Sequence, residues 1–238
     1  MPPRTPIWKA IAASLRNDIA EGLYGTGQKL PTETALAARF GVNRHTVRHA
    51  LSALIDEGLV YARRGSGVFV QTTPTDYPIG PRVRYHQNLK AAGRTPTKTV
   101  LSTQTRPANA GERDALALKD DAMVHVYEGL SLSDNQPIAL FRSVFPADRF
   151  PDFLTKLADN TSVTETLKLY GVTDYTRAST RVNAKLATAT QALHLQISEH
   201  APILRTISVN IDPEGTPIEV GRTWFAGDKV TLTLSDIG

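Results

Sequence analysis

The sequence predicts a mixed α+β protein of two domains: a helical domain over residues 1–73, a linker over 74–83 and a larger antiparallel α+β domain over 84–238. Three observations predict this division. Apolar residues follow a helical period in the first domain, and strand-like segments with hairpin turns dominate the second. A proline-rich stretch without periodicity separates the two. The length of 238 residues also suits two ordinary domains.

The first domain begins with a predicted helix over residues 7–22, because an isoleucine or leucine recurs at every fourth position from Ile7 to Ile19. The segment Leu30-Pro31-Thr32-Glu33 then opens a second, short helix. Thr32 can cap this helix, and the negative charge of Glu33 favours its positive end. Gly41 is suited to end it in a left-handed conformation.

A third helix is predicted over residues 43–57, with Asn43 as its cap and Gly58 beyond its end. Two helices joined by a short turn that contains glycine form a helix-turn-helix. Short β-prone runs over 59–63 and 68–71 flank the sequence Arg64-Gly65-Ser66-Gly67, which predicts a hairpin with a basic tip. This order of elements is that of a winged helix-turn-helix.

The start of the third helix carries the candidate DNA-contacting residues. Arg44, His45 and Arg48 fall opposite the apolar stripe, and this end of the helix supplies base contacts in helix-turn-helix proteins. Arginine can bind the O6 and N7 atoms of guanine together, and Thr46 can add a base or phosphate contact. Arg63 and Arg64, beside the glycine turn, can approach the DNA backbone or the minor groove. The alternative interpretation is a solvated amphipathic helix next to a basic hairpin.

The distribution of charge agrees with this interpretation. Residues 1–73 contain nine Lys or Arg against five Asp or Glu, which accounts for the whole formal charge of +4, and residues 74–238 are neutral. A basic domain joined to a neutral one is typical of a polyanion-binding module with a partner of different function.

The second domain mixes strands and short helices. Strands are predicted over residues 97–106, 124–133, 137–145, 175–185, 203–212, 217–225 and 229–234. Helices are predicted over 110–116, 150–157, 163–170 and 188–195, the third opening with a capping box from Ser162 to Glu165. Turns at Asp134-Asn135 and Pro213-Glu214-Gly215 favour antiparallel pairing.

Several arginines of this domain are candidates for a pocket that binds a small anion. Polar residues alternate along 175–185, which puts Arg177 and Arg181 on one face of the strand. Arginine binds phosphate, phosphonate or carboxylate with two hydrogen bonds. The alternative is the solvated face of a half-buried sheet.

Further candidates lie in apolar strands and in the loop after the linker. Arg142 and Arg222 need a partner or ligand if they are buried, because an unpaired buried charge is costly. Glu219 can be that partner, or can bind a ligand hydroxyl or amine. His86 and Asn88 can contribute from the loop.

Several classes of function are not expected. The chain has no cysteine, its six histidines form no ligand cluster, and no paired-carboxylate or nucleophile–base motif is present. We therefore expect no metal, no cofactor and no catalysis. No apolar run approaches a membrane span or a signal-peptide core, so the expected location is the cytoplasm.

The first domain resembles the GntR family of bacterial regulators over about 60 residues. The matching segments include Leu30-Pro31-Thr32-Glu33, Phe40-Gly41-Val42, Asn43-Arg44, Thr46-Val47-Arg48 and Gly65-Ser66-Gly67. The resemblance implies DNA contacts by Arg44, His45, Thr46, Arg48 and the wing tip at Gly65, Ser66 and Gly67. One departure is Thr34, where many members have arginine, so a DNA contact at that position is in doubt.

The second domain resembles the UTRA effector domain of the HutC branch of that family. The matching segments are Gly93 with Thr95-Pro96, the turn Asp134-Asn135-Gln136-Pro137-Ile138, the helix opened by Ser162 and ended by Tyr170-Gly171, and Gly215-Thr216-Pro217-Ile218-Glu219 followed by Gly227-Asp228-Lys229. The resemblance implies a chorismate-lyase-like fold with a small-molecule pocket, to which Ser162 contributes. Sugar-phosphate-binding relatives carry arginines where this chain has Gly129 and Ser131.

The resemblance is strongest to regulators of phosphonate metabolism, through Arg84-Tyr85, Asn88-Leu89 and Arg222-Thr223-Trp224-Phe225. It implies a homodimeric, ligand-responsive regulator, commonly a repressor, that binds double-stranded DNA with an inverted repeat and senses a small anion such as a phosphonate or phosphate ester. Sensing of a sugar phosphate or an amino-acid metabolite is the alternative. An enzyme of the chorismate-lyase type and an architectural DNA binder without ligand are remoter alternatives.

Overall fold

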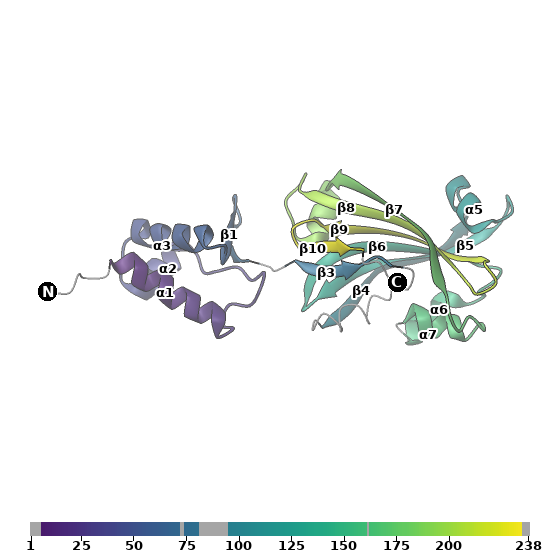
Figure 1. Ribbon diagram of the computed structural model, residues 1–238, viewed down its shortest axis with the longest axis horizontal. Coiled ribbons are helices and arrows are strands. Elements are labelled where there is room, and N and C mark those ends of the chain that lie inside the picture. Colours follow the sequence, from purple (N-terminus) through teal and green to yellow (C-terminus); the bar gives the residue numbers. More distant parts are fainter. Residues whose placement is uncertain (1–5, 72–73, 81–94, 161, 235–238) are drawn as a thin grey trace. The chain divides into compact units, whose positions relative to one another are not determined.

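The chain consists of two compact units, Met1–Thr73 and Pro74–Gly238 (Figure 1). A computed structural model describes residues 6–71, 74–80, 95–160 and 162–234. No helix among these residues is long and apolar enough to cross a membrane.

The first unit has the predicted order of three helices and a hairpin. The elements are α1 (Ile7–Ala20), α2 (Glu33–Phe40), α3 (Arg44–Asp56), β1 (Val60–Arg63) and β2 (Gly67–Val70). The apolar stripe of α3 packs against α1 and α2, and Leu15, Leu36 and Val47 are fully buried. Burial of this stripe leaves the opposite side of α3 exposed, including its first turn.

Local side-chain caps set the ends of α2 and α3, as predicted. The Thr32 side chain accepts a hydrogen bond from Ala35 N at 3.2 Å, and Asn43 Oδ1 accepts one from Thr46 N at 2.9 Å. Gly41 ends α2 with φ +64°, a left-handed conformation that is cheap for glycine. The helix-turn-helix geometry is therefore encoded within a few residues of sequence.

The second unit is built on a six-stranded antiparallel sheet with the strand order β4-β5-β6-β9-β8-β7. Its strands are β4 (Pro96–Pro107), β5 (Met123–Ser133), β6 (Gln136–Pro146), β7 (Thr176–Leu186), β8 (Pro202–Ile211) and β9 (Pro217–Ala226). At the tip of the β5–β6 hairpin, Asp134 and Asn135 both have positive φ, as a two-residue hairpin turn requires. The predicted α+β class and the antiparallel pairing are confirmed.

The helices divide between the two faces of this sheet. On one face, α6 (Phe153–Asn160) and α7 (Val163–Lys168) pack on a cluster that includes Tyr127, Phe141 and Phe145. On the other face, α5 (Ala110–Leu116) packs against strand β9, and its Leu116 joins a cluster with Val124 and Val220. On the same face, α8 (Ala189–Leu195) packs beside Ile203 and Trp224. Figure 1 shows α6 and α7 together near one end of the sheet.

The predicted linker over 74–83 is wrong in part, because it contains a strand. Residues Thr75–Pro78 form β3, which pairs in parallel with β10 (Val230–Thr233). Tyr77 of β3 is buried against Phe225 of the main sheet, with ring centroids 5.0 Å apart. The pairing joins segments about 150 residues apart, so no local pattern could predict it.

Candidate DNA interface and effector pocket

The first turn of α3 presents three exposed cationic or polar side chains. Arg44, His45 and Arg48 are exposed, whereas Val47 and Ala50 on the inner side are fully buried. Thr46 is half-buried, and its hydroxyl donates to Asn43 Oδ1 at 3.0 Å. The structure therefore brings the predicted arginines together on one surface, while the hydroxyl of Thr46 is already used in the cap.

Glu33 at the start of α2 holds the arginines of α3. Arg48 donates from Nε to Glu33 Oε1 at 3.0 Å and from Nη2 to Oε2 at 2.8 Å, and Arg44 Nη2 lies 3.5 Å from the same Oε2. These contacts lower the pKa of Glu33, chiefly through the hydrogen bond from Arg48. Sequence reasoning assigned Glu33 only to the helix end and missed this second role.

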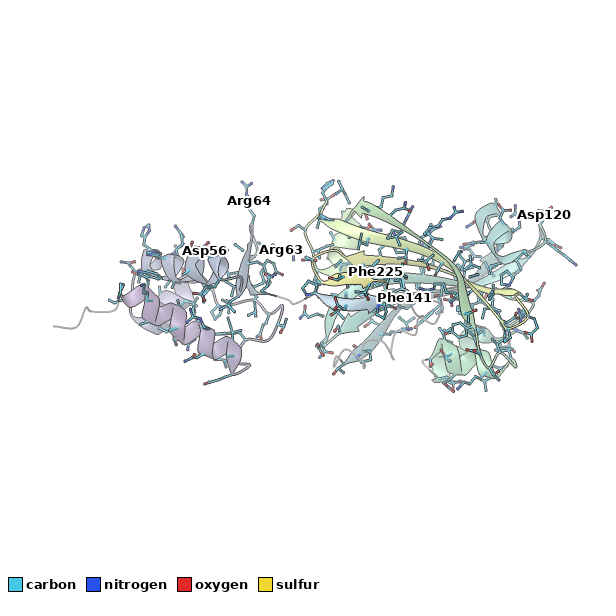
Figure 2. All side chains as sticks on the ribbon, viewed as in Figure 1. Asp56, Arg63, Arg64, Asp120, Phe141 and Phe225 are labelled. Atoms are coloured by element: carbon cyan, nitrogen blue, oxygen red, sulfur yellow. The ribbon has the colours of Figure 1, made fainter. Side chains whose placement is uncertain are left out.

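The wing is a tight turn with a basic tip. Ser66 N donates to Arg63 O at 2.9 Å, and Gly65 and Gly67 have φ of +74° and +114°, a region that strongly favours glycine. Arg64 is exposed and projects from the hairpin, while Arg63 is half-buried (Figure 2). The side chain of Lys29 lies over Gly67, since a Cβ at Gly67 would approach Lys29 Cε to 2.8 Å. Lys29 is a wing cation that the sequence analysis missed.

A pocket of about 240 Å³ lies on the face of the sheet that carries α6 and α7. Its wall comes from strand β3 through Tyr77, from the start of α7 through Ser162 and Thr164, and from the segment before β7 through Tyr175. The sheet contributes small polar side chains to its floor, namely Ser131, Ser143, Ser208 and Thr223. A cavity of this size with converging polar groups is suited to a small molecule.

The charged residues of the pocket are Lys98, Glu165, Arg177 and Glu219. Asn210 lies between Arg177 and Glu219: its amide nitrogen donates to Glu219 Oε2 at 2.7 Å, and Arg177 Nε donates to its amide oxygen at 3.4 Å. Burial raises the pKa of the Tyr77 hydroxyl to about 12, and the nearby charges of Arg177 and Glu219 act on this pKa in opposite directions. Of the predicted effector residues, the structure thus brings Ser162, Arg177 and Glu219 together.

Lys98 supplies a cation to the pocket from the edge strand β4. It is in register with Ser131 on the neighbouring strand, and its Nζ lies 5.2 Å from the centroid of the Phe141 ring. Burial lowers the pKa of Lys98, and the charge of Glu219 opposes that shift. At Gly129 no side chain fits, because a Cβ would lie 2.5 Å from Thr99 O.

Three predicted effector residues lie on the other face of the sheet. Arg142 follows Phe141 and precedes Ser143, which both line the pocket, so its side chain points away from it. Arg222 is the register partner of Arg142 and shares that face. The assignment of Arg142 and Arg222 to the pocket is not supported.

A β-bulge explains why Arg181 is separated from Arg177. The register shifts between Arg177 and Ser179, so that Ala178 is an extra residue in β7. Arg181 then pairs with Ile207, which faces away from the pocket, whereas Arg177 pairs with the pocket residue Asn210. A single inserted residue reverses the alternation that predicted both arginines on one face.

On that second face Arg142 contacts Glu128 through its Nε. Burial, and then the neighbouring charges of Arg142 and Arg205, lower the pKa of Arg222. The remaining predicted residues, His86 and Asn88, lie outside the described residues. Sequence reasoning missed Tyr77, Lys98 and Asn210, because pairing between distant strands rather than local pattern brings them to the pocket.

A winged helix with exposed arginines on α3 and a separate unit with a small polar pocket define a ligand-responsive transcriptional regulator. Comparison with known proteins agrees with this class. The model of the bacterial regulatory proteins, gntR family, matches residues 8–70, and the UTRA domain model matches residues 91–231. The chain belongs to the GntR family and carries a UTRA domain.

Two relatives that are named as transcriptional regulators align with this chain over nearly their whole length. The uncharacterized HTH-type transcriptional regulator RB1450 of Rhizobium meliloti is 38% identical over 96% of this chain and 94% of its own length. The transcriptional regulator PhnF of Escherichia coli is 32% identical over 95% and 94%, respectively. Among solved structures, PhnF from Mycobacterium smegmatis superposes with a TM-score of 0.65 at 25% identity, covering 94% of this chain and 98% of that one. The expected GntR and UTRA organisation is confirmed.

Proposed function

We propose that the protein is a homodimeric repressor that binds an inverted-repeat DNA site and releases it when a small acid occupies the pocket. The winged helix supports the first part, because Arg44, His45 and Arg48 stand exposed at the helix start that reads base edges in such domains. A homodimer would place two such helices on half-sites about one helical turn apart.

The observation that carries the proposal is the position of Tyr77. Tyr77 lines the pocket, and its strand β3 begins at Thr75, shortly after β2 of the winged helix ends at Val70. A ligand that contacts Tyr77 therefore acts on the segment that follows the DNA-binding unit. Such a ligand can shift a pre-existing equilibrium between DNA-competent and DNA-incompetent arrangements.

The cations of the pocket support an acid as the ligand. Arg177 can bind a phosphonate, phosphate or carboxylate group with two hydrogen bonds, and Lys98 adds a second positive charge. Hydroxyl groups of Ser162 and Ser208 can donate to the same group. A phosphonate or phosphate ester is the proposed class, in agreement with the resemblance to regulators of phosphonate metabolism.

The test is a thermal-shift screen of the full chain against small phosphonates, phosphate esters and carboxylates. A true ligand at a hundredfold excess over its dissociation constant stabilises the folded state by about 2.7 kcal/mol. The expected result is stabilisation by one class of acid, lost in Arg177→Ala. Equal response to neutral analogues of these compounds would contradict acid sensing.

A further inference from the structure

Three acidic side chains are buried in the described part of the second unit, and they differ in the groups that neutralise their charge. Glu112 is 8% exposed and receives two hydrogen bonds from Arg106, at 2.7 and 2.8 Å. Asp212 is 5% exposed and pairs with Arg149. Glu219 is 8% exposed, yet no cation within the described part of the chain lies within 4.0 Å of its carboxylate.

The neutral Asn210 amide is the hydrogen-bond partner of Glu219 in the described residues, and it occupies one oxygen, Oε2. Burying a carboxylate without a cation is costly, and hydrogen bonds to a neutral amide offset only part of that cost. Of the three buried acids, Glu219 is also the one that lines the cavity. A cationic group of a bound ligand can therefore reach Glu219.

The cavity has a positive and a negative side held apart by one side chain. Arg177 contacts the oxygen of the Asn210 amide, and Glu219 contacts its nitrogen, so the amide keeps the two charges from pairing with each other. Lys98 lies on the edge strand β4, and its positive charge is attracted by Glu219, although these two described residues form no ion pair within 4.0 Å. A ligand with opposite charges a few bonds apart matches this arrangement.

We infer that the ligand of this pocket is a zwitterion, with its acid group at Arg177 and an ammonium group at Glu219. The inference rests on the proposed acid-sensing function and narrows its ligand class. A ligand hydroxyl in place of the ammonium would leave the negative charge of Glu219 without a cationic partner. Hydroxyl groups of a ligand could instead bind the side chains of other pocket residues, namely Ser131, Ser143, Ser208 and Thr223.

The experiment uses matched pairs of acids that differ only in the amine. Isothermal titration of the full chain compares 2-aminoethylphosphonate with ethylphosphonate, 3-aminopropylphosphonate with propylphosphonate, and β-alanine with propionate. A charge-assisted contact to Glu219 predicts that the amine of at least one pair binds about tenfold more tightly or better. Glu219→Gln should reduce that preference to less than about threefold. The control Glu214→Gln, the same change in the exposed turn, should retain it.

The outcomes separate this inference from the function on which it rests. If an acid and its amine bind equally in the wild type, the ligand is an acid but not a zwitterion, and the inference is overturned while acid sensing stands. A preference for the amine that persists in Glu219→Gln overturns the role of Glu219. If neither member of any pair binds and no acid of the thermal-shift screen stabilises the chain, acid sensing itself is contradicted. The wild-type comparison needs no variant, so it is independent of whether Glu219→Gln folds.

Discussion

Arg48 on α3 and Glu33 on α2 are joined by two hydrogen bonds, from Nε at 3.0 Å and from Nη2 at 2.8 Å. The pair uses the Nε–Nη2 edge of the guanidinium, so the Nη1–Nη2 edge can still form two hydrogen bonds, and the Arg48 side chain is 58% exposed. An arginine held in this way has fewer conformations to lose when it binds a base. We propose that Glu33 positions Arg48 for a base contact.

This relationship predicts different consequences for the two partners. Arg48→Ala should cost about 1–3 kcal/mol at one base position of the preferred site, because a bidentate base contact is lost. Glu33→Gln should weaken binding to that site, because Arg48 loses the carboxylate that holds it. It should not weaken binding to random DNA, since it also removes a negative charge that would repel the phosphates. Fluorescence anisotropy with a duplex selected from a random pool and with a scrambled duplex measures both.

Glu57→Gln is the matched control for Glu33→Gln. Glu57 pairs with Arg16 at 2.8 Å, at the other end of α3. The control should leave the ratio of specific to random affinity unchanged. An equal loss on both duplexes for Arg48→Ala would show that Arg48 contacts only phosphate.

The exposed wing arginine should contribute affinity without specificity. Arg64 projects from the hairpin tip and is suited to a phosphate contact (Figure 2). Arg64→Ala should weaken binding to all sequences alike and reduce the slope of log affinity against log salt concentration by about 0.9. A salt titration of both duplexes provides the measurement, and a loss restricted to the preferred duplex would contradict this role.

Gly129 should tolerate no side chain. A Cβ at this position would lie 2.5 Å from the backbone oxygen of Thr99 and 2.8 Å from the Phe141 ring. Gly129→Ala should therefore destabilise the second unit by about 1–3 kcal/mol, as overpacking of a core does. Gly111→Ala is the control, because its Cβ would meet its nearest neighbour at an ordinary 3.6 Å. Urea unfolding followed by circular dichroism distinguishes the two, and equal stability would refute the predicted collision.

The stability of the second unit should fall in acid through Asp212. Burial opposes ionisation of this carboxyl, but the hydrogen bond from Arg149 and two backbone N–H groups outweigh it and lower the pKa of Asp212. A carboxyl with a lowered folded-state pKa stabilises the fold above its ordinary value of 3.8, and loses that contribution as the pH falls through the folded-state value.

Urea unfolding at a series of pH values tests this dependence. Asp212→Asn should be less stable than the wild type near pH 7 and should lose less stability below about pH 4. A residual slope is expected, because the pKa values of Glu112 and Glu128 are also lowered and these groups titrate in the same direction. Parallel curves for the wild type and the variant would contradict the contribution of Asp212.

The local parts of the fold could be predicted from the sequence. The predicted third helix over 43–57 differs from α3 by one residue at each end, because Asn43 and the glycine after the helix act within one turn. The hairpin at Asp134-Asn135 was predictable for the same reason: both residues tolerate the positive φ that the turn demands.

The pocket could be predicted only in part, because its geometry depends on pairing between distant strands. The bulge at Ala178 has no polar or apolar signature, yet it sends Arg181 to the face opposite Arg177. Lys98 reaches the pocket through its register with Ser131. Tyr77 reaches it because β3 pairs with β10 at the far end of the chain. Single-strand alternation contains none of this information.

We propose above that a ligand in the pocket controls DNA binding. The most direct test is the affinity of the full chain for its selected duplex, measured by anisotropy with and without a saturating amount of the acid that stabilises the protein. With the ligand, the affinity of the wild type for DNA should be at least about tenfold lower, and that of Arg177→Ala should not change. An unchanged affinity in the wild type at saturation would contradict it.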